Sequence, residues 1–247
     1  MLYNERMVFV EGANSLSSGA VSIKVTTTEQ LGTTLKALGL QQERPTLVLV
    51  GGAGGMSPAA VGKISAFFED LLIPFIEAHQ IAVLDGGTNT GVMEAIGSAR
   101  TRLAAAFPLI GVLVEKLARE TPGMLQKDHT HFVLTPGSKW GEEVPWLSRL
   151  ASAVAGGAPS LTLLINGGDI AWQDAAESVA ASRPVLVAEG TGRTADDIAR
   201  TSTGQSLDPR AVKLLKSQLV FVTNPYTQPD LFVSRMKDIY DHPRKEP

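Results

Sequence analysis

Asp85-Gly-Gly-Thr-Asn-Thr-Gly-Val-Met93 is the stretch of this chain that decides its fold. The apolar residues 81–84 before it are typical of a short buried strand, and the apolar residues after it recur at helical spacing. A strand therefore enters a helix through a loop of glycine and small polar residues. Because glycines let a ligand approach the main chain and a helix N-terminus attracts anions, this loop predicts a phosphate site, the alternative being only a tight turn with an N-cap. Its candidate contacts are Gly86, Gly87, Thr88, Asn89 and Thr90.

The same pattern occurs three more times. Apolar runs at 46–50, 161–165 and 185–188 each end in a glycine-rich turn that is followed by a predicted helix. In an open α/β sheet such turns gather at the carboxyl edge of the strands, where ligands bind. These turns add to the candidate site Gly51, Gly52, Ala53, Gly54, Gly55, Gly167, Gly168, Asp169, Glu189, Gly190, Thr191, Gly192 and Arg193.

Strands and helices are predicted to alternate along the whole chain. Such alternation favours an α/β fold with a Rossmann-like, doubly wound, mostly parallel sheet and helices on both faces. We expect residues 1–247 to form a single domain, in which the N-terminal strands and helix of residues 1–45 join the same sheet and residues 241–247 are a frayed tail. Residues 116–128 are expected to be an irregular loop that acts as a mobile flap.

Composition limits the classes of function. The chain has 247 residues, of which 44% are hydrophobic and 19% charged, and its net charge is −3. This balance argues against a nucleic-acid-binding surface, which needs clustered Lys and Arg. Without cysteine there is neither a disulfide framework nor a thiolate site. Because we find no signal peptide and no apolar run long enough to span a bilayer, we expect a cytoplasmic protein without membrane insertion.

A nucleotide-type ligand also needs an acceptor for its ribose hydroxyls. Asp85 and Glu189 directly follow predicted strands, where a carboxylate can bind a ribose diol as in dinucleotide folds. The alternative for each is capping or turn stabilisation. Asp169 is expected to cap its own helix, because a carboxylate beside a phosphate would repel it.

A cationic group and a flat surface for the base complete such a site. Arg193 can add a full charge to a helix N-terminus that already favours anions, or it can be an ordinary surface arginine. Trp140 and Trp172 adjoin predicted loops and can stack on a base, although tryptophan is more often part of a core.

Other chemistries have weaker support in the sequence. His129 and His131 share one face of a predicted strand, but Asp128 is the only other donor nearby and metal sites take three or four ligands, so we expect no metal. A Gly-X-Ser-X-Gly elbow is missing, which argues against a serine hydrolase. No glycine-rich loop ends in Gly-Lys-Ser/Thr, which argues against a P-loop NTPase.

The motifs as a group resemble a known superfamily. Segments 85–93, 129–132 with 141–145, and 184–197 (PVLVAEGTGRTADD) are similar to SLOG proteins, in particular to the prokaryotic LSDAT branch and the cytosolic amino-terminal domain of melastatin-type transient receptor potential channels. The likeness covers residues 46–199. It implies a Rossmann-like sensor or binding domain for ADP-ribose or another nucleotide-derived molecule that requires no cofactor. It also implies that the glycine-rich turns, with Arg193, line the pocket.

The superfamily also contains phosphoribohydrolases with a Pro-Gly-Gly-X-Gly-Thr-X-X-Glu signature. The matching stretch here, Asn166 to Asp174, has Ile170 and Ala171 in place of the glycine and threonine, and Asp174 in place of the catalytic glutamate. The shorter carboxylate puts hydrolysis in doubt, because an acid or base must be within hydrogen-bond reach of its proton. As an enzyme, the chain would use Asp174 or Glu189 as acid/base and Arg193 to hold phosphate. A scaffold with a vestigial pocket is a third interpretation.

Two further expectations concern variants and assembly. A β-branched residue at Gly87 is expected to block the phosphate while leaving the fold largely intact. Apolar helix faces suggest a homodimer or a larger homo-oligomer.

Overall fold

A computed structural model describes residues 20–40, 43–52, 54–121 and 123–241 of the chain. Residues 1–19 of the expected N-terminal strands, the candidate Ala53 and residues 242–247 of the expected tail lie outside these ranges. One sheet of eight strands runs through the molecule, and every neighbouring pair in it is parallel. The strands are β1 (Val21–Lys24), β2 (Thr46–Gly51), β3 (Ala82–Asp85), β4 (Leu109–Val114), β5 (His131–Thr135), β6 (Ser160–Ile165), β7 (Val185–Ala188) and β8 (Val220–Thr223).

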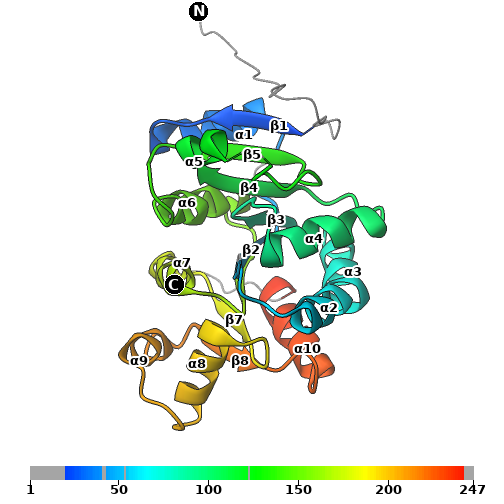
Figure 1. Ribbon diagram of the computed structural model, residues 1–247, viewed down its shortest axis with the longest axis vertical. Coiled ribbons are helices and arrows are strands. Elements are labelled where there is room, and N and C mark those ends of the chain that lie inside the picture. The colour runs from blue at the N-terminus through cyan, green and yellow to red at the C-terminus, as the bar shows by residue number, and fades with distance from the viewer. Residues whose placement is uncertain (1–19, 41–42, 53, 122, 242–247) are drawn as a thin grey trace, which may run out of the picture.

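The strand order places a topological switch point at the centre of the sheet. The order is β1-β5-β4-β3-β2-β6-β7-β8, so the chain builds outward from β2 on one side, then returns to β6 and builds outward on the other (Figure 1). The connection from β2 to β3 and the connection from β6 to β7 therefore lead toward opposite edges of the sheet. The turns that follow these two strands flank the point at which open α/β sheets bind ligands.

Helices cover both faces of the sheet, which confirms the predicted fold class (Figure 1). Strand residues alternate between the two cores: Val48 and Val50 of β2 face one, and Leu47 and Leu49 face the other. The first face is covered by α1 (Leu31–Ala37), α6 (Val144–Ala155), α7 (Asp169–Ala180), α8 (Arg193–Ser202) and α9 (Pro209–Leu215). The second is covered by α2 (Pro58–Phe67), α3 (Ile73–Ala78), α4 (Gly91–Arg102) and α10 (Pro229–Tyr240).

Pro74 does not end the helix that contains it. A π-helical segment, η2 (Phe68–Leu72), joins α2 to α3 and lies directly before this proline. Inside an α-helix, proline removes one backbone hydrogen bond, and its ring collides with a carbonyl of the preceding turn. The wider π-turn relieves this collision. The chain therefore passes the proline and delivers the aromatic residues Phe67, Phe68 and Phe75 to the core.

The segment expected to be an irregular flap is partly helical and is bound to the Asp85 loop. Its first part forms α5 (Glu115–Glu120). Its last part pairs with the loop after β3, where Asn89 N donates to Met124 O (2.6 Å) and Gln126 N donates to Gly87 O (3.0 Å). These bonds cover the Asp85 loop with residues 124–126.

Exposed apolar residues do not form a helix face in the described ranges. The large exposed side chains come from five different elements or turns: Val21, Leu103, Trp140, Leu207 and Leu231. The homo-oligomer therefore stays a prediction. Among the helices of these ranges, none has the length and apolar character needed to cross a bilayer.

Candidate functional site

Most helices that follow a strand begin without a side-chain cap, and among them α4, α7 and α8 follow the predicted glycine-rich turns. The N-cap residues of α4, α7 and α8 are Thr90, Gly168 and Gly192, and none of their side chains accepts a hydrogen bond from the helix. By contrast, Ser57 caps α2 by accepting from Ala60 N at 3.2 Å. The expected cap by Asp169 is not formed, since Asp169 is the exposed first residue of α7. Backbone carbonyls satisfy part of the first turns, since Val92 N of α4 donates to Gly52 O (3.2 Å) and Ala195 N of α8 donates to Asn166 O (2.9 Å). The first N–H groups of these helices are otherwise left without an intrahelical partner.

Several of the predicted residues meet around Gly52. A Cβ built on Gly52 would lie 2.5 Å from Asn166 Oδ1 and 3.4 Å from both Arg193 Nη1 and Gly167 O. We call the set Gly52, Asn166, Gly167, Gly168, Gly192 and Arg193 the Gly52 junction. It joins the turns after β2, β6 and β7 at the switch point of the sheet.

Asn166 fixes the geometry of the Gly52 junction. Its backbone has φ +58°, which asparagine tolerates better than most residues. Its side-chain Nδ2 donates to Thr191 O at 2.7 Å, and its backbone N donates to Thr191 Oγ1 at 2.8 Å. These two bonds connect the turn after β6 to the turn after β7. Asn166 Oδ1 is buried and has no hydrogen-bond partner in the part of the chain that the structure describes, so an acceptor faces Gly52.

Arg193 contributes the positive charge of the junction. Its backbone is left-handed (φ +50°), which turns its side chain back over the glycine turns. Arg193 Nη1 donates to Gly54 O at 3.1 Å, and Nη2 would be 2.8 Å from a Cβ on Gly168. A side chain at position 168 would displace the guanidinium from this position. Since Arg193 is exposed and, among the described residues, bonds only to a backbone carbonyl, its other N–H groups can bind an anion.

The amides of the junction are available as well. The structure gives the backbone N–H groups of Gly167, Gly168 and Gly192 no acceptor within the described residues. Thr194, the second residue of α8, does not cap its helix, since its Oγ1 donates to Gly168 O at 3.1 Å. Donors and a guanidinium therefore adjoin one another at the point where β2 and β6 diverge.

The Asp85 loop is built differently from the prediction. Asp85 is fully buried, and its Oδ1 accepts from Gly87 N (2.7 Å) and lies 2.8 Å from His129 Nε2. The carboxylate therefore does not reach a surface where a ribose could bind, which makes its predicted role as a ribose acceptor wrong for this structure. A Cβ on Gly87 would lie 2.8 Å from Gly111 Cα and 3.1 Å from the Phe132 ring. Gly87 is thus required by the packing of β3 on β4 and β5.

His129, considered only as a metal ligand from the sequence, is the partner of this buried carboxylate. Gln126 Oε1 accepts from Asp128 N at 2.8 Å and also lies 3.0 Å from His129 Nδ1. Because an amide oxygen can only accept, His129 Nδ1 must be the donor of this second bond. A proton then also lies between His129 Nε2 and Asp85 Oδ1, and the pair as a whole carries no net charge. His131 bonds instead to Leu38 O (3.1 Å) and Thr130 Oγ1 (2.7 Å). The two histidine rings serve separate structural contacts.

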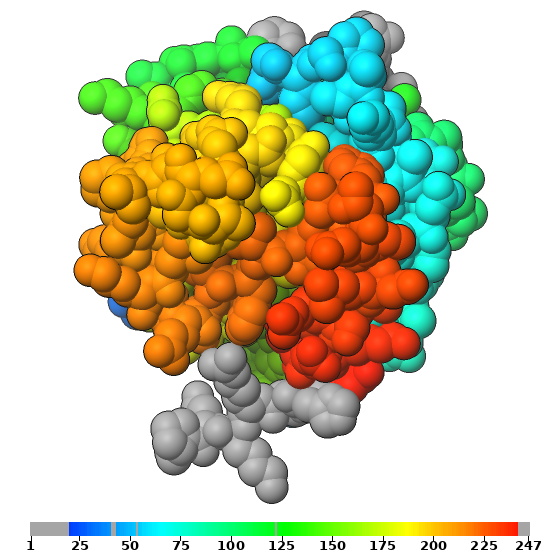
Figure 2. All heavy atoms as spheres, turned by 90° about the horizontal axis from the view of Figure 1, so that it is seen from below, coloured from blue at the N-terminus to red at the C-terminus, as the bar shows by residue number. Residues whose placement is uncertain are grey.

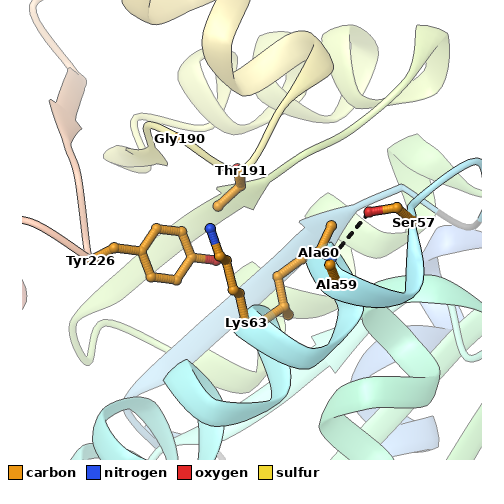
Figure 3. A pocket seen from close by; sticks show the side chains of 8 residues that line it. Ser57, Ala59, Ala60, Lys63, Gly190, Thr191 and Tyr226 are labelled. Carbon is orange, nitrogen blue, oxygen red and sulfur yellow. Dashed lines mark hydrogen bonds between the residues drawn. The ribbon is translucent and has the colours of Figure 1, made fainter.

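A pocket of about 200 Å³ adjoins the Gly52 junction on the side of α2. Figure 2 shows the surfaces of α2 (cyan), the β7–α8 turn (yellow) and the segment around residue 226 (orange) meeting on the β8 end of the molecule. We call it the Lys63 pocket, since the Lys63 side chain extends from α2 toward Thr191 and the Tyr226 ring (Figure 3). It is lined by Ser57, Ala59, Ala60, Lys63, Ile64, Gly190, Thr191 and Tyr226. Sequence reasoning named only Gly190 and Thr191 of this set.

The remaining acidic candidates, Asp174 and Glu189, make other contacts. Burial, together with the neighbouring carboxylates of Glu143 and Glu177, raises the pKa of Asp174 to about 8. Burial likewise raises the pKa of Glu143, whose carboxylate accepts from Gly141 N at 2.9 Å. Asp174 therefore faces acids of α6 and α7. Glu189 is partly exposed, and its backbone N donates to Thr223 O at 3.1 Å.

Neither tryptophan named from the sequence lines the Lys63 pocket. Trp172 is buried in the core, and the Arg210 guanidinium lies 4.2 Å from its ring centroid. Trp140 is 49% exposed on the turn before α6. The aromatic residue that the structure brings to the pocket is Tyr226, which follows β8. No spacing in the sequence connects Lys63 with Tyr226, because they are 163 positions apart.

Comparisons with known proteins agree with this architecture. Residues 44–229 match the family model LSDAT_prok, described as SLOG in TRPM, prokaryote. The "Transient receptor potential cation channel subfamily M member-like 2" of Nematostella vectensis is 26% identical over 236 residues, which cover 73% of this chain but only 15% of that protein. A solved structure, the molybdenum cofactor binding protein from the phototrophic bacterium Rippkaea orientalis, superposes with a TM-score of 0.52 at 14% identity over 79% of this chain and 99% of that one. This last likeness shows the fold.

Proposed function

Since this chain belongs to the LSDAT family, the prokaryotic form of the SLOG domain in TRPM, we propose that it is a cytosolic binding domain that senses a nucleotide-derived small molecule such as ADP-ribose. The relative from Nematostella vectensis carries a similar domain in a much longer chain. A nucleotide-binding role fits a chain whose glycine-rich turns meet at the switch point of a parallel sheet.

The observation that carries the proposal is the composition of the Gly52 junction. Unpartnered amides at Gly167, Gly168 and Gly192 adjoin an exposed guanidinium, Arg193, at the N-termini of α7 and α8. Two helix N-termini and a guanidinium favour a negatively charged group such as a diphosphate. Asn166 Oδ1, a buried acceptor without a partner, is placed to accept a hydrogen bond from a ligand hydroxyl.

Thermal unfolding with ADP-ribose tests the proposal. At about 100 times its Kd, a ligand stabilises the fold by roughly 2.7 kcal/mol, which raises the Tm of a chain of this size by roughly 5–10 °C. We expect this rise in the wild type, with ADP-ribose recovered intact by mass spectrometry. Arg193→Gln should weaken binding about tenfold, because a charge-assisted hydrogen bond is lost.

Arg149→Gln is the matched control, since Arg149 is an exposed arginine on α6 away from the junction. It should leave the Tm rise unchanged. The proposal fails if ADP-ribose and related nucleotides leave the Tm of the wild type unaltered, or if Arg193→Gln behaves as Arg149→Gln does.

A glycosidic hydrolase of nucleoside 5′-monophosphates or NAD derivatives is the second candidate, and Asp174 is the observation that favours it. A carboxyl group with a pKa of about 8 stays protonated at neutral pH and can donate a proton to a leaving base. Release of free base or ribose phosphate during the same incubation, abolished by Asp174→Asn, would support the enzyme over the sensor.

A further inference from the structure

Two polar side chains that line the Lys63 pocket, Lys63 and Tyr226, make no hydrogen bond or ion pair with the rest of the described chain. Figure 3 shows the Lys63 side chain directed into the space between α2 and the β7–α8 turn, with the Tyr226 ring beside it. A lysine ammonium offers three donors and no acceptor.

Tyr226 is held as a donor in this position. Its ring packs edge-on against Phe67, with centroids 6.4 Å apart, and its backbone N donates to Asn224 Oδ1 at 3.0 Å. Burial raises the pKa of the Tyr226 hydroxyl, and the carboxylate of Asp196 raises it further, so the phenol keeps its proton at neutral pH. The ring is therefore fixed and the hydroxyl remains able to donate.

The other polar groups around the pocket are already bonded. Thr191 Oγ1 donates to Ala188 O at 2.6 Å, and Ser57 Oγ accepts from Ala60 N. The nearby Asp196 carboxylate accepts from Gly190 N at 2.7 Å. The rest of the lining consists of glycine and the apolar side chains Ala59, Ala60 and Ile64. The pocket thus offers a positive charge and donors, which match a group that has only acceptors and a negative charge.

We infer that the Lys63 pocket is a second anion subsite, which holds a terminal phosphate of a ligand whose inner phosphate lies at the Gly52 junction. This inference rests on the proposed function for the inner phosphate alone. The two places are joined through Thr191, which lines the pocket and whose carbonyl accepts from Asn166 Nδ2. At about 200 Å³ the pocket is smaller than the roughly 300–1,000 Å³ that drug-sized ligands occupy, so it takes one end of the ligand.

A site-resolved titration of the full chain tests the subsite without an organic ligand. Reductive methylation with ¹³C-formaldehyde gives each lysine an NMR signal and keeps its charge, and the signals of Lys63 and Lys213 are assigned by their loss in Lys63→Arg and Lys213→Arg. Inorganic pyrophosphate should shift the Lys63 signal saturably, with little shift of Lys213, an exposed lysine on α9. Tyr226→Phe should weaken this affinity by about threefold to tenfold, since one neutral hydrogen bond is lost. The inference is overturned if the Lys63 signal moves no further than that of Lys213, or if Tyr226→Phe leaves the affinity unchanged.

Calorimetry with phosphorylated ligands separates this inference from the proposed function. ADP-ribose that carries an extra phosphate, at the 1″ or the 2′ position, should bind about tenfold more tightly than ADP-ribose itself. Lys63→Gln should abolish that gain, and Lys213→Gln should keep it. If ADP-ribose binds but neither extra phosphate adds affinity in the wild type, the subsite is wrong while the proposed function stands. If no nucleotide binds but pyrophosphate shifts Lys63, the proposed function fails and the subsite stands.

Discussion

The turn after β3 and the turns that form the Gly52 junction share one sequence pattern but serve different ends. In the Asp85 loop, the protein uses its own groups to bind the glycine turn: Gly87 N donates to Asp85 Oδ1, and Asn89 N donates to Met124 O. In the junction, the amides of Gly167 and Gly168 have no acceptor within the described residues. A glycine-rich turn before a helix therefore indicates where the chain reverses, while the neighbouring side chains decide whether a ligand binds there.

Charge separates the two regions further. A buried carboxylate, Asp85, lies under the turn after β3, and His129 compensates it. The junction instead carries an exposed guanidinium, Arg193, with only a carbonyl as partner. We therefore interpret the Asp85 loop as a structural support for the start of α4, and the junction as the place that binds an anion.

The largest effect is expected from the buried pair. His129→Leu removes the group that compensates the fully buried Asp85 carboxylate and should lower the free energy of unfolding by about 3–5 kcal/mol. Urea unfolding of the two chains measures the difference. A loss below about 1 kcal/mol would mean that the buried Asp85 carboxylate does not need His129 as its partner. The Asp85 loop could then no longer be interpreted as a structural support.

Two glycine variants test the comparison directly. Gly87→Ala places a Cβ 2.8 Å from Gly111 Cα in a left-handed backbone (φ +64°) and should cost roughly 2–4 kcal/mol of stability, contrary to the sequence-based expectation that the fold stays intact. Gly52→Ala directs its Cβ at a single side-chain oxygen, Asn166 Oδ1, and not at backbone, so it should cost roughly 1–2 kcal/mol yet prevent ADP-ribose binding.

Thermal unfolding with and without ADP-ribose measures both quantities in one experiment. Gly32→Ala is the control, because a Cβ there meets nothing within 4 Å and Gly32 lies on α1, outside the candidate site. If Gly87→Ala folded normally and lost the ligand while Gly52→Ala kept it, the roles assigned to the two regions would be reversed.

The smallest effect is expected from Asp174, whose carboxyl group has no compensating cation among the described residues. Below the ordinary aspartate pKa of 3.8 both states bind the Asp174 proton, but between there and about 8 only the folded chain keeps it, so stability falls as pH rises through this window. Asp174→Asn removes this cost and should stabilise the fold at pH 9 by about 1–2 kcal/mol, with little effect near pH 4. Urea unfolding across that pH range should therefore show a free energy of unfolding that depends less on pH in the variant. Parallel pH profiles of the two chains would show that the pKa of Asp174 is not raised in the folded state.

The fold could be predicted well because the order of strands and helices follows from local periodicity in the sequence. Apolar runs such as 109–114 and the glycines after them are visible in any short window, and parallel strands then force the turns to one edge. What the sequence did not predict depends on contacts between distant residues. Asp85 is bonded to a histidine 44 positions away, and Gly87 is required because Gly111 lies against it. The Lys63 pocket was missed for the same reason.

Co-crystallisation with ADP-ribose tests the central claim most directly. The account predicts that the diphosphate lies within hydrogen-bond distance of the amides of Gly167 and Gly168 and of the Arg193 guanidinium. It also predicts that Asp85 and His129 stay bonded to each other beneath their loop. A diphosphate bound instead at residues 86–90, with the Gly52 junction free of ligand, would contradict it.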